Sequence, residues 1–512
     1  MSKANPNLLF INYPLLDKGL PTHNRTDRSI SPNLAFGYLG TIADSLDCNV
    51  TIIDANFYLR PYNTDALITK ILELKPDLIG FSVFINNALW GYEFLNLVKQ
   101  VYNNCLFVAG GPHASILPEE LLAHGFDICC RRESEKTIKE LIGYLRGEIQ
   151  LSDIKSINYY NENKEIINNA DREIETNLDS IPIINYDLFD KLYFSPENVA
   201  TTKFQVFTSR GCPNRCTYCN SYGVFGSGFR TRSVDNVLEE LELIHKKYGV
   251  KKINFVDDYF VLNNKRVVEI CEGMMKNNIN LSWGCYSKAG AIGDDLFEIM
   301  KKSGCDHIGY GVENVYPKTL QLINKKTPLR KINEAYEKTN PTRIHYKTNI
   351  MAGFPWETVE SLRTNIDFIL AKKRKFEALF NPVVLYPVPS TKLYEDYVND
   401  FPIIKDHWLN KDFMLENSDL SSQGRMKLNF FNLNKKVIKE IKFLFFCCKI
   451  PPLSTLTGFK FFILYPLNKF FYSYWGAKIL ELVYNTKQHL LEQLPKLLNF
   501  IKALTRLKSS AT

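Results

Sequence analysis

Long apolar runs are absent from this sequence of 512 residues. A membrane-spanning helix needs about 18 or more consecutive apolar residues. The nearest stretch, residues 443–475, is interrupted by three lysines and three prolines. The amino-terminal segment MSKANPNLLFINYP also lacks the apolar core and the small-residue cleavage site of a signal peptide. We therefore expect neither a spanning helix nor secretion, and we predict a cytoplasmic protein.

A disulfide framework is also missing. The chain has 12 cysteines, but they are scattered apart from one cluster of three. Closely spaced disulfides belong to small secreted domains, so these cysteines indicate thiols in a reducing compartment. A closed zinc site normally takes four ligands, often from two C-x2-C pairs, and no second pair follows the cluster.

Positive charge is concentrated in one segment. The net charge is +8, yet residues 430–512 hold 13 Lys and Arg against 3 Asp and Glu, so the rest of the chain is close to neutral. A content of 45% apolar and 23% charged residues is typical of globular proteins and excludes a mostly disordered or collagen-like chain. Besides its lysines, the basic segment contains many apolar residues, which is unusual for a nucleic-acid-binding surface, and no RNA-binding module is visible. We therefore expect no nucleic-acid partner.

The first 145 residues alternate short apolar runs with helix-length stretches. This pattern predicts parallel βαβ units and a doubly wound, Rossmann-like α/β sheet. The expected strands are residues 7–13, 49–54, 77–84, 105–111 and 126–130. Such sheets bind ligands at the carboxyl ends of their strands. The small or polar residues at those ends are Ser82, Gly110, Gly111 and His113. Ordinary tight turns explain them equally well.

The runs SPNLAFGYLGTIADSL, DLIGFSVF, AGGPHAS and RRESEKTIKELI resemble the cobalamin-binding domain of cobalamin-dependent radical S-adenosylmethionine enzymes. The resemblance covers about residues 6–145 and implies that the four strand-end residues bind cobalamin. The Asp-x-His-x-x-Gly motif is absent, which implies a cobalt without a protein histidine. Arg132 stands where the family usually has glycine. For His113, a hydrogen-bonding role is favoured over metal ligation.

Three cysteines stand together in the run TSRGCPNRCTYC, residues 208–219. Cys212, Cys216 and Cys219 have the spacing C-x3-C-x2-C. Thiolates are the ligands of iron–sulfur clusters. Three of them in one loop can hold three irons of a [4Fe-4S] cluster and leave the fourth iron open to a small molecule. The preceding run KFQVF predicts a strand that leads into the loop.

This spacing, with an aromatic residue before the last cysteine, resembles the radical S-adenosylmethionine motif. The resemblance covers about residues 200–400 and implies a partial (β/α)6 barrel of the TIM type. It places the second, fourth and fifth barrel strands in residues 253–260, 307–314 and 350–358.

The same resemblance implies that the three cysteines hold a catalytic [4Fe-4S] cluster that reductively cleaves S-adenosylmethionine. It also implies polar and turn residues around that cofactor. The candidates are Tyr218, Asp257, Asp258, Glu313, Gly353 and Pro355. Each of the three carboxylates could instead be an ordinary residue at a strand end.

We predict four regions. They are a cobalamin-binding domain (1–145), a linker with a β-hairpin (146–200), the partial barrel (201–400) and a helical carboxyl-terminal extension (401–512). In the extension, apolar residues from Leu490 to Leu504 recur at helical spacing beside lysines. This pattern is typical of an amphipathic helix on an anionic membrane. A helical lid packed on the barrel is the alternative.

The two resemblances together imply an enzyme that makes a 5′-deoxyadenosyl radical. Its commonest reaction in this family is methylation of an unactivated carbon or phosphorus in a small-molecule or lipid substrate. An external electron donor of the flavodoxin or ferredoxin type is implied, and residues 430–512 suggest a peripheral membrane contact. The alternatives are ring closure, rearrangement or oxidation by the same cofactors, or a non-catalytic sensor that binds cobalamin and an iron–sulfur cluster.

Overall fold

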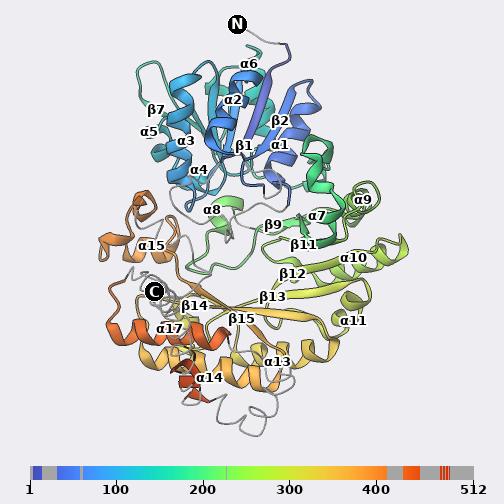
Figure 1. Ribbon diagram of the computed structural model, residues 1–512, viewed down its shortest axis with the longest axis vertical. Coiled ribbons are helices and arrows are strands. Elements are labelled where there is room, and N and C mark those ends of the chain that lie inside the picture. Colours follow the sequence, from blue (N-terminus) through green and yellow to red (C-terminus); the bar gives the residue numbers. More distant parts are fainter. Residues whose placement is uncertain are drawn as a thin grey trace, which may run out of the picture.

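The protein has two lobes, stacked along its longest axis (Figure 1). The computed structural model describes residues 4–13, 31–57, 62–226, 228–411, 431–449, 473–474, 477–478, 480–482 and 484. Within these ranges no helix has both the length and the apolar character that crossing a membrane requires.

The amino-terminal lobe is built on a seven-stranded sheet with the order β2-β1-β3-β4-β5-β6-β7. Its first five strands are parallel, which confirms the predicted doubly wound sheet. The strands are β1 (Asn7–Asn12), β2 (Asn49–Asp54), β3 (Leu78–Ser82), β4 (Leu106–Gly110), β5 (Ile128–Cys130), β6 (Ile157–Tyr160) and β7 (Ile166–Asn168).

Helices cover both faces of this sheet (Figure 1). All five residues of β3 are buried, as expected for a central strand between two helical layers. The helices are α1 (Leu34–Asp44), α2 (Thr64–Leu74), α3 (Ala88–Val101), α4 (Pro112–Ile116), α5 (Pro118–Ala123) and α6 (Glu135–Leu145). Asn33 begins α1 because its side chain accepts a hydrogen bond from the Phe36 amide.

The second lobe is an open, six-stranded parallel sheet with the order β15-β14-β13-β12-β11-β8. The second and fourth strands overlap the residues that the resemblance implied, whereas the fifth begins earlier, at His345, and shares only residues 350–352 with the implied range because the rest of that range forms the turn before α14 (Val359–Lys375). The strands are β8 (Lys203–Val206), β11 (Lys252–Phe255), β12 (Ser282–Lys288), β13 (Cys305–Glu313), β14 (His345–Ala352) and β15 (Leu379–Val384). Sequential parallel strands joined by helices give the expected partial barrel.

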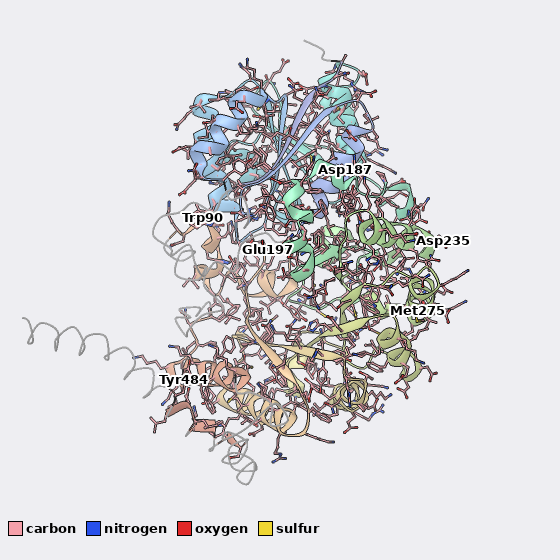
Figure 2. All side chains as sticks on the ribbon, turned by 45° about the vertical axis from the view of Figure 1, so that its right-hand side comes forward. Trp90, Asp187, Glu197, Asp235, Met275 and Tyr484 are labelled. Carbon is pink, nitrogen blue, oxygen red and sulfur yellow. The ribbon has the colours of Figure 1, made fainter. Side chains whose placement is uncertain are left out.

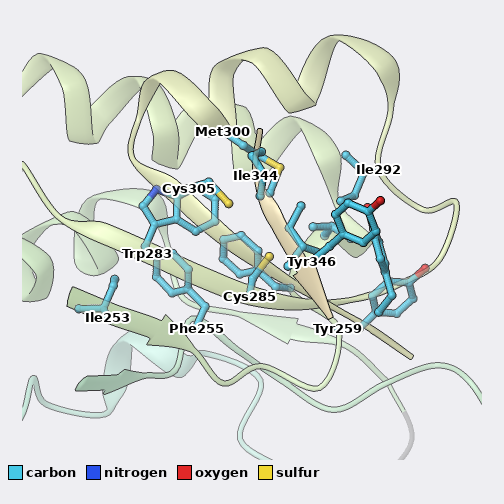
Figure 3. Close-up of a cluster of buried hydrophobic side chains, with 14 of the residues drawn as sticks. Ile253, Phe255, Tyr259, Trp283, Cys285, Ile292, Met300, Cys305, Ile344 and Tyr346 are labelled. Atoms are coloured by element: carbon cyan, nitrogen blue, oxygen red, sulfur yellow. The ribbon is translucent and has the colours of Figure 1, made fainter. Parts of the chain in front are cut away.

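The barrel helices are α9 (Val234–Lys246), α10 (Asn264–Lys276), α11 (Asp294–Lys302), α12 (Pro317–Leu322), α13 (Leu329–Thr339) and α14 (Val359–Lys375). All but one of them share an apolar core with this sheet, and the exception, α12, places Leu320 in the cluster beside Tyr218. Figure 3 shows part of the core between the two layers, in which the ring centroids of Phe255 and Trp283 lie 5.4 Å apart. Ser233 begins α9 as expected, since its hydroxyl accepts from the Asn236 amide.

The connector between the lobes is well packed. The predicted hairpin is β6 and β7, and it extends the first sheet by pairing with β5. A later part of the connector contacts α9: Tyr186 donates to Glu240 at 2.9 Å, and Asp187, labelled in Figure 2, pairs with Lys247. Short helix α7 (Pro196–Thr201) then leads into β8.

The chain returns to the amino-terminal lobe after the barrel and α15 (Lys392–Tyr397). Trp408 is buried in the core of that lobe, and its indole N–H lies 3.1 Å from the Glu120 carboxylate. Lys411 pairs with Glu93 and lies over the ring of Trp90. This segment therefore contacts the first lobe directly and does not only cover the barrel.

Helix α17 (Lys435–Lys449) packs against α14 and β15. Its buried side includes Phe443 and Leu444, which is the packing expected of a helical lid on the barrel. Its opposite side exposes lysines, namely Lys435, Lys436, Lys439, Lys442 and Lys449. The leucine pattern from Leu490 to Leu504 lies outside the described residues.

Candidate active site at the barrel mouth

The cysteine loop begins with a short antiparallel ladder. After β8, strand β9 (Ser209–Arg210) pairs with β10 (Arg230–Thr231). Gly211 then turns the chain with φ +83°, and a Cβ atom there would lie 2.5 Å from the Gly228 carbonyl oxygen. Only glycine fits this turn, so the ladder and the turn together set the position of Cys212.

The three predicted cluster ligands lie within electrostatic reach of one another. Cys212 and Cys216 are partly buried, and Cys219 is exposed. Protein atoms around the sulfurs reduce their solvation, which raises the pKa of Cys216 and raises that of Cys219 to about 11, and neighbouring thiols add to both shifts. The Asn214 amide donates to the sulfur of Cys212 at 3.3 Å. Among the described residues, no three His, Cys, Asp or Glu side chains converge on one metal ion.

The number and the common loop of these thiols suit a cubane cluster. A cubane takes one thiolate at each of three irons, so its ligands lie farther apart than the ligands of a single ion. The donors are three thiols from one loop, which leaves one iron without a protein ligand. The cysteines present therefore fit a [4Fe-4S] cluster better than a closed zinc site.

Asp257 and Asp258 brace the two ends of the cysteine loop. Asp257 is fully buried and accepts hydrogen bonds from the Thr208 amide at 2.7 Å and the Ser209 hydroxyl at 2.8 Å. Asp258 accepts from the Ser221 hydroxyl at 2.6 Å, just past the last cysteine. Burial raises the pKa of both carboxyls. Their bonds are to the loop itself, so their role in this structure is to support it.

Glu313 and Lys325 form an ion pair beside Tyr218. Glu313 ends β13 with φ +66°, where the register with β14 shifts, and it is almost fully buried. The Lys325 ammonium lies 3.4 Å from the Glu313 carboxylate and 3.4 Å from the Tyr218 hydroxyl. Burial raises the pKa of Glu313, and Lys325 opposes the rise. Sequence reasoning missed Lys325, because only the return of the chain after α12 brings it back to this strand end.

The turn at Gly353 and Pro355 depends on Glu357, which was not among the predicted site residues. Gly353 has φ +96° and donates its amide to the Glu357 carboxylate at 3.0 Å. Glu357 also accepts from the Ser361 hydroxyl at 3.0 Å and is only 5% exposed. Burial raises its pKa to about 7. Glu357 belongs to the run Gly-x-Pro-x-Glu-Thr of residues 353–358, but its place in that run does not show that it accepts the hydrogen bonds of this turn.

The strand ends of the first lobe are shaped by close backbone contacts. Gly111 has φ +96°, and a Cβ atom there would lie 2.9 Å from the Val83 carbonyl oxygen. A Cβ atom on Gly110 would have no neighbour closer than 3.9 Å, so this strand end is open. Ser82 ends the adjacent strand and is buried.

His113 is a hydrogen-bonding residue, as the sequence favoured. Its Nε2 lies 2.9 Å from the Glu120 carboxylate, which also accepts from the Tyr92 hydroxyl at 2.6 Å. The ring is almost fully buried, and its Nδ1 has no partner among the described residues.

A narrow apolar pocket lies between this sheet and helices α1 and α6. Its lining includes Phe36, Gly80, Gly110, Ser134 and Ile138. A Cβ atom on Gly80 would lie 2.8 Å from the Phe10 ring, so a larger residue would crowd this wall. An open glycine edge beside an apolar slot fits a large ligand with a flat face and an apolar appendage, and thus fits cobalamin.

A buried ion cluster joins this lobe to the cysteine loop. Arg210 donates to Glu133 at 2.8 Å and to Glu135 at 2.5 Å, and Arg230 donates to Glu133 at 2.9 Å. All four side chains are at most 16% exposed. Arg132, which replaces the glycine usual in the family, has φ +60°. That conformation favours glycine and explains the family's preference.

Two family models match the chain. A model of the Radical SAM superfamily, where SAM denotes S-adenosylmethionine, matches residues 206–369, and a model of the B12 binding domain matches residues 24–142. An uncharacterized methyltransferase of Pyrococcus horikoshii is 31% identical over 395 residues, which make up 76% of this chain and 84% of that relative.

Two further similarities are more distant. The anaerobic magnesium-protoporphyrin IX monomethyl ester cyclase of Rubrivivax gelatinosus is 26% identical over 61% of this chain and 57% of the cyclase. The radical S-adenosylmethionine methyltransferase TsrM of Kitasatospora setae, solved with cobalamin and a [4Fe-4S] cluster, has a TM-score of 0.65 at 16% identity. That match covers 77% of this chain and 78% of TsrM and shows a common fold.

The raised pKa of Glu357 predicts a pH-dependent stability. A carboxyl whose pKa is higher in the folded state stabilises the fold while protonated, and this contribution is lost as the pH rises towards 7. Between pH 5 and 8 we expect the free energy of unfolding of the wild type to fall by ~2–3 kcal/mol relative to Glu357→Gln. Urea titrations at both pH values measure it, and a constant difference would contradict the assignment.

Substitutions in the ion cluster should lower the free energy of unfolding strongly, and their effects should not be additive. Arg210→Met leaves the buried Glu135 without its arginine and leaves Glu133 with Arg230 alone, so we expect a loss of about 3 kcal/mol of unfolding free energy. The triple variant Arg210→Met, Glu133→Gln, Glu135→Gln should cost less than the sum of its single changes. Arg330→Met, which breaks an exposed pair with Glu334, is the control and should cost under about 1 kcal/mol. Additive losses would refute a coupled cluster.

Proposed function

We infer that this chain, which belongs to the radical S-adenosylmethionine enzymes that carry a B12-binding domain, is a cobalamin-dependent methyltransferase. One observation carries the proposal. The three-cysteine loop at the barrel mouth is joined by the ion cluster to the strand ends of the first lobe. Methyl transfer between two cofactors requires that their sites be held close together. The ion cluster supports this, because it fixes the cysteine loop against the strand ends of the first lobe.

The residues at the mouth have distinct parts in this proposal. The cluster, S-adenosylmethionine and cobalamin supply reducing electrons, a radical source and a methyl carrier when they are bound. Cys212, Cys216 and Cys219 hold the cluster. Lys325 and Glu313 offer opposite charges next to Cys216, which suits the carboxylate and ammonium groups of an amino acid.

Other residues at the mouth would shape the same pocket. Tyr218 packs beside the ion pair, and the turn at Gly353 and Pro355 borders the end of β14. Asp257 and Asp258 keep the cysteine loop in place through the hydrogen bonds described above. They are positioning residues in this proposal.

The strand ends of the first lobe would hold cobalamin. Gly110 and Gly111 allow the backbone to approach a flat ring, and Ser82 offers a hydroxyl beside them. The Nε2 atom of His113 is hydrogen-bonded to Glu120. We therefore assign His113 a role in positioning the loop after β4, and that atom is not a ligand of cobalt.

Methylation is favoured over the other reactions of this family by the Pyrococcus relative, which is described as a methyltransferase and is the more similar of the two relatives. The acceptor would be an unactivated carbon or phosphorus of a small molecule or lipid. Ring closure is the second candidate, because the Rubrivivax relative is described as a cyclase. An external flavodoxin or ferredoxin would supply the electrons.

Loss of one cysteine should abolish the reaction. We expect Cys216→Ala to lower 5′-deoxyadenosine formation by at least a hundredfold after anaerobic reconstitution, because one iron loses its ligand. Liquid chromatography of the quenched reaction measures the product. Cys271→Ala, a buried cysteine of α10, is the control and should retain formation. Undiminished product from Cys216→Ala would sink the radical proposal.

Membrane contact through residues 430–512 is part of the same proposal. The exposed lysines of α17 support it, since none has an ion-pair partner among the described residues, and each can add about 1 kcal/mol near an anionic surface. We expect the wild type to float with phosphatidylglycerol vesicles and not with phosphatidylcholine vesicles. The variant Lys435→Glu, Lys439→Glu, Lys442→Glu should float at least tenfold less. Equal flotation of both proteins would contradict the contact.

A further inference from the structure

Residues 391–411, which follow the barrel, form a strap between the cysteine loop and the first lobe. Figure 1 shows α15 of this strap at the level where the two lobes meet. Near the start of the strap, the Leu393 amide donates to the Thr217 carbonyl at 2.9 Å, and Thr217 lies between two of the cluster ligands. Tyr394 then packs against the apolar clusters of both the barrel mouth and the first lobe. Near the end of the strap, Trp408 is buried in the first lobe. The strap therefore connects the surroundings of the two proposed cofactor sites.

The buried end of the strap meets one carboxylate, that of Glu120 in α5. The indole N–H of Trp408 lies 3.1 Å from both oxygens of this carboxylate. The same carboxylate accepts from the Tyr92 hydroxyl at 2.6 Å and lies 2.9 Å from Nε2 of His113. The rings of His113 and Trp408 also meet edge to face, with their centroids 6.1 Å apart. One carboxylate therefore ties α3, α4 and α5 to the strap.

The His113 ring depends on this carboxylate for its orientation. The side chain is 1% exposed, and its Nδ1 has no hydrogen-bond partner among the described residues. In that part of the chain the hydrogen bonds of the ring are all made by Nε2, to Glu120 and to the Tyr92 hydroxyl at 3.3 Å. The Tyr92 hydroxyl is itself bound to Glu120. A change at Glu120 therefore acts on every hydrogen bond that holds this buried ring.

Helix α4, which carries His113, fastens the ends of strands β3, β4 and β5. It directly follows β4. The His113 amide donates to the Val83 carbonyl, just past β3, at 3.0 Å. The Ser115 hydroxyl accepts from the Arg132 amide, just past β5, at 2.8 Å. Helix α4 also contacts α8 (Ser221–Phe225), the helix that follows the cysteine loop. A shift of α4 would therefore displace the backbone at the strand ends to which we assign cobalamin.

We propose that Trp408 is a positioning residue for the cobalamin site. Its hydrogen bond to Glu120 holds His113 and α4 in place, and α4 in turn holds the strand-end backbone that faces cobalamin. The inference deepens the proposed function and rests on it, since it is there that the strand ends are assigned to cobalamin. It adds a residue from outside the first lobe. Because the strap also bonds to the cysteine loop, the contact at Trp408 sets the two loops relative to each other.

Apolar packing alone does not account for this contact. Trp283 in the barrel core is similarly buried, and its indole N–H donates to the Ser303 carbonyl, a backbone group of its own lobe. The Trp408 N–H meets instead a carboxylate that is 15% exposed and bonded to two other side chains. Burying a carboxylate is unfavourable unless donors surround it, and hydrogen bonds to a charged group are the stronger ones. Removal of one donor therefore weakens the whole cluster around Glu120.

Titration with hydroxocobalamin tests this role. The probe is added anaerobically to the full-length enzyme with its reconstituted cluster, and its absorbance gives the Kd. We expect Trp408→Phe, which keeps an aromatic ring and removes the N–H, to weaken binding about tenfold. The matched control is Trp283→Phe, which also loses a buried indole hydrogen bond but lies in the barrel core. Since that site is independent of α4, its Kd should stay within about twofold of the wild type.

Hydrogen exchange gives a readout that does not depend on cobalamin. In the cobalamin-free enzyme, the amides of residues 111–117 should exchange about fivefold faster in Trp408→Phe than in the wild type, and Trp283→Phe should leave them unchanged. Glu120→Gln alters the contact from its other side, so the test stands even where Trp408→Phe fails to fold. The double variant should weaken hydroxocobalamin binding by less than the product of the two single effects, because both act through one contact.

The outcomes separate this inference from the proposed function. Equal binding of hydroxocobalamin by the wild type and Trp408→Phe, or equal exchange of residues 111–117, would overturn the positioning role alone. Equal weakening by Trp283→Phe would indicate a general loss of stability and would also overturn it. Absence of binding to the wild type would overturn the cobalamin site of the proposed function, and the positioning role with it. Circular dichroism and iron content verify that each variant is folded.

Discussion

The ion cluster of Glu133, Glu135, Arg210 and Arg230 is the contact on which the arrangement of the two lobes depends. It connects the first turn of α6 to the ladder that leads into the cysteine loop, and it lies in a region that excludes most water. Four buried charges are stable only when each has its partner. The geometry between the lobes is therefore coupled to the geometry of the loop, and Trp408 adds a second contact on Glu120.

The charged residues at the barrel mouth fall into two groups, those that support the cysteine loop and those that face the cysteines. Carboxylates that support the loop, such as Asp257, are buried and fully hydrogen-bonded, whereas the Glu313–Lys325 pair ends a strand with strained backbone and faces the cysteines. Strained residues persist where the surrounding structure holds them, and such places are often functional. Glycines at Gly211, Gly309 and Gly311 make room that no other residue would leave.

Much of the fold could be predicted from the sequence, because short-range patterns determine it. The five parallel strands of the first lobe and the second and fourth strands of the barrel lie where alternation and the resemblance placed them, whereas the fifth barrel strand begins earlier, at His345. The path of the segment around Trp408 could not be predicted, since a tryptophan in an aperiodic stretch carries no signal of which lobe will bury it. The predicted domain limits and site residues remain predictions.

The sequence by itself indicated the class of cofactor, because three thiols at fixed spacing on one loop are ligands that suit an iron–sulfur cluster. It also determined that Arg132 departs from the family, although not why. Only the tertiary structure decided which groups meet: Lys325 with Glu313, Glu357 with the Gly353 turn, and Trp408 with Glu120. The reason is physical. Metal-ligand spacing is local in the chain, whereas ion pairs and buried hydrogen bonds depend on register and on helices that return distant residues to the same strand end.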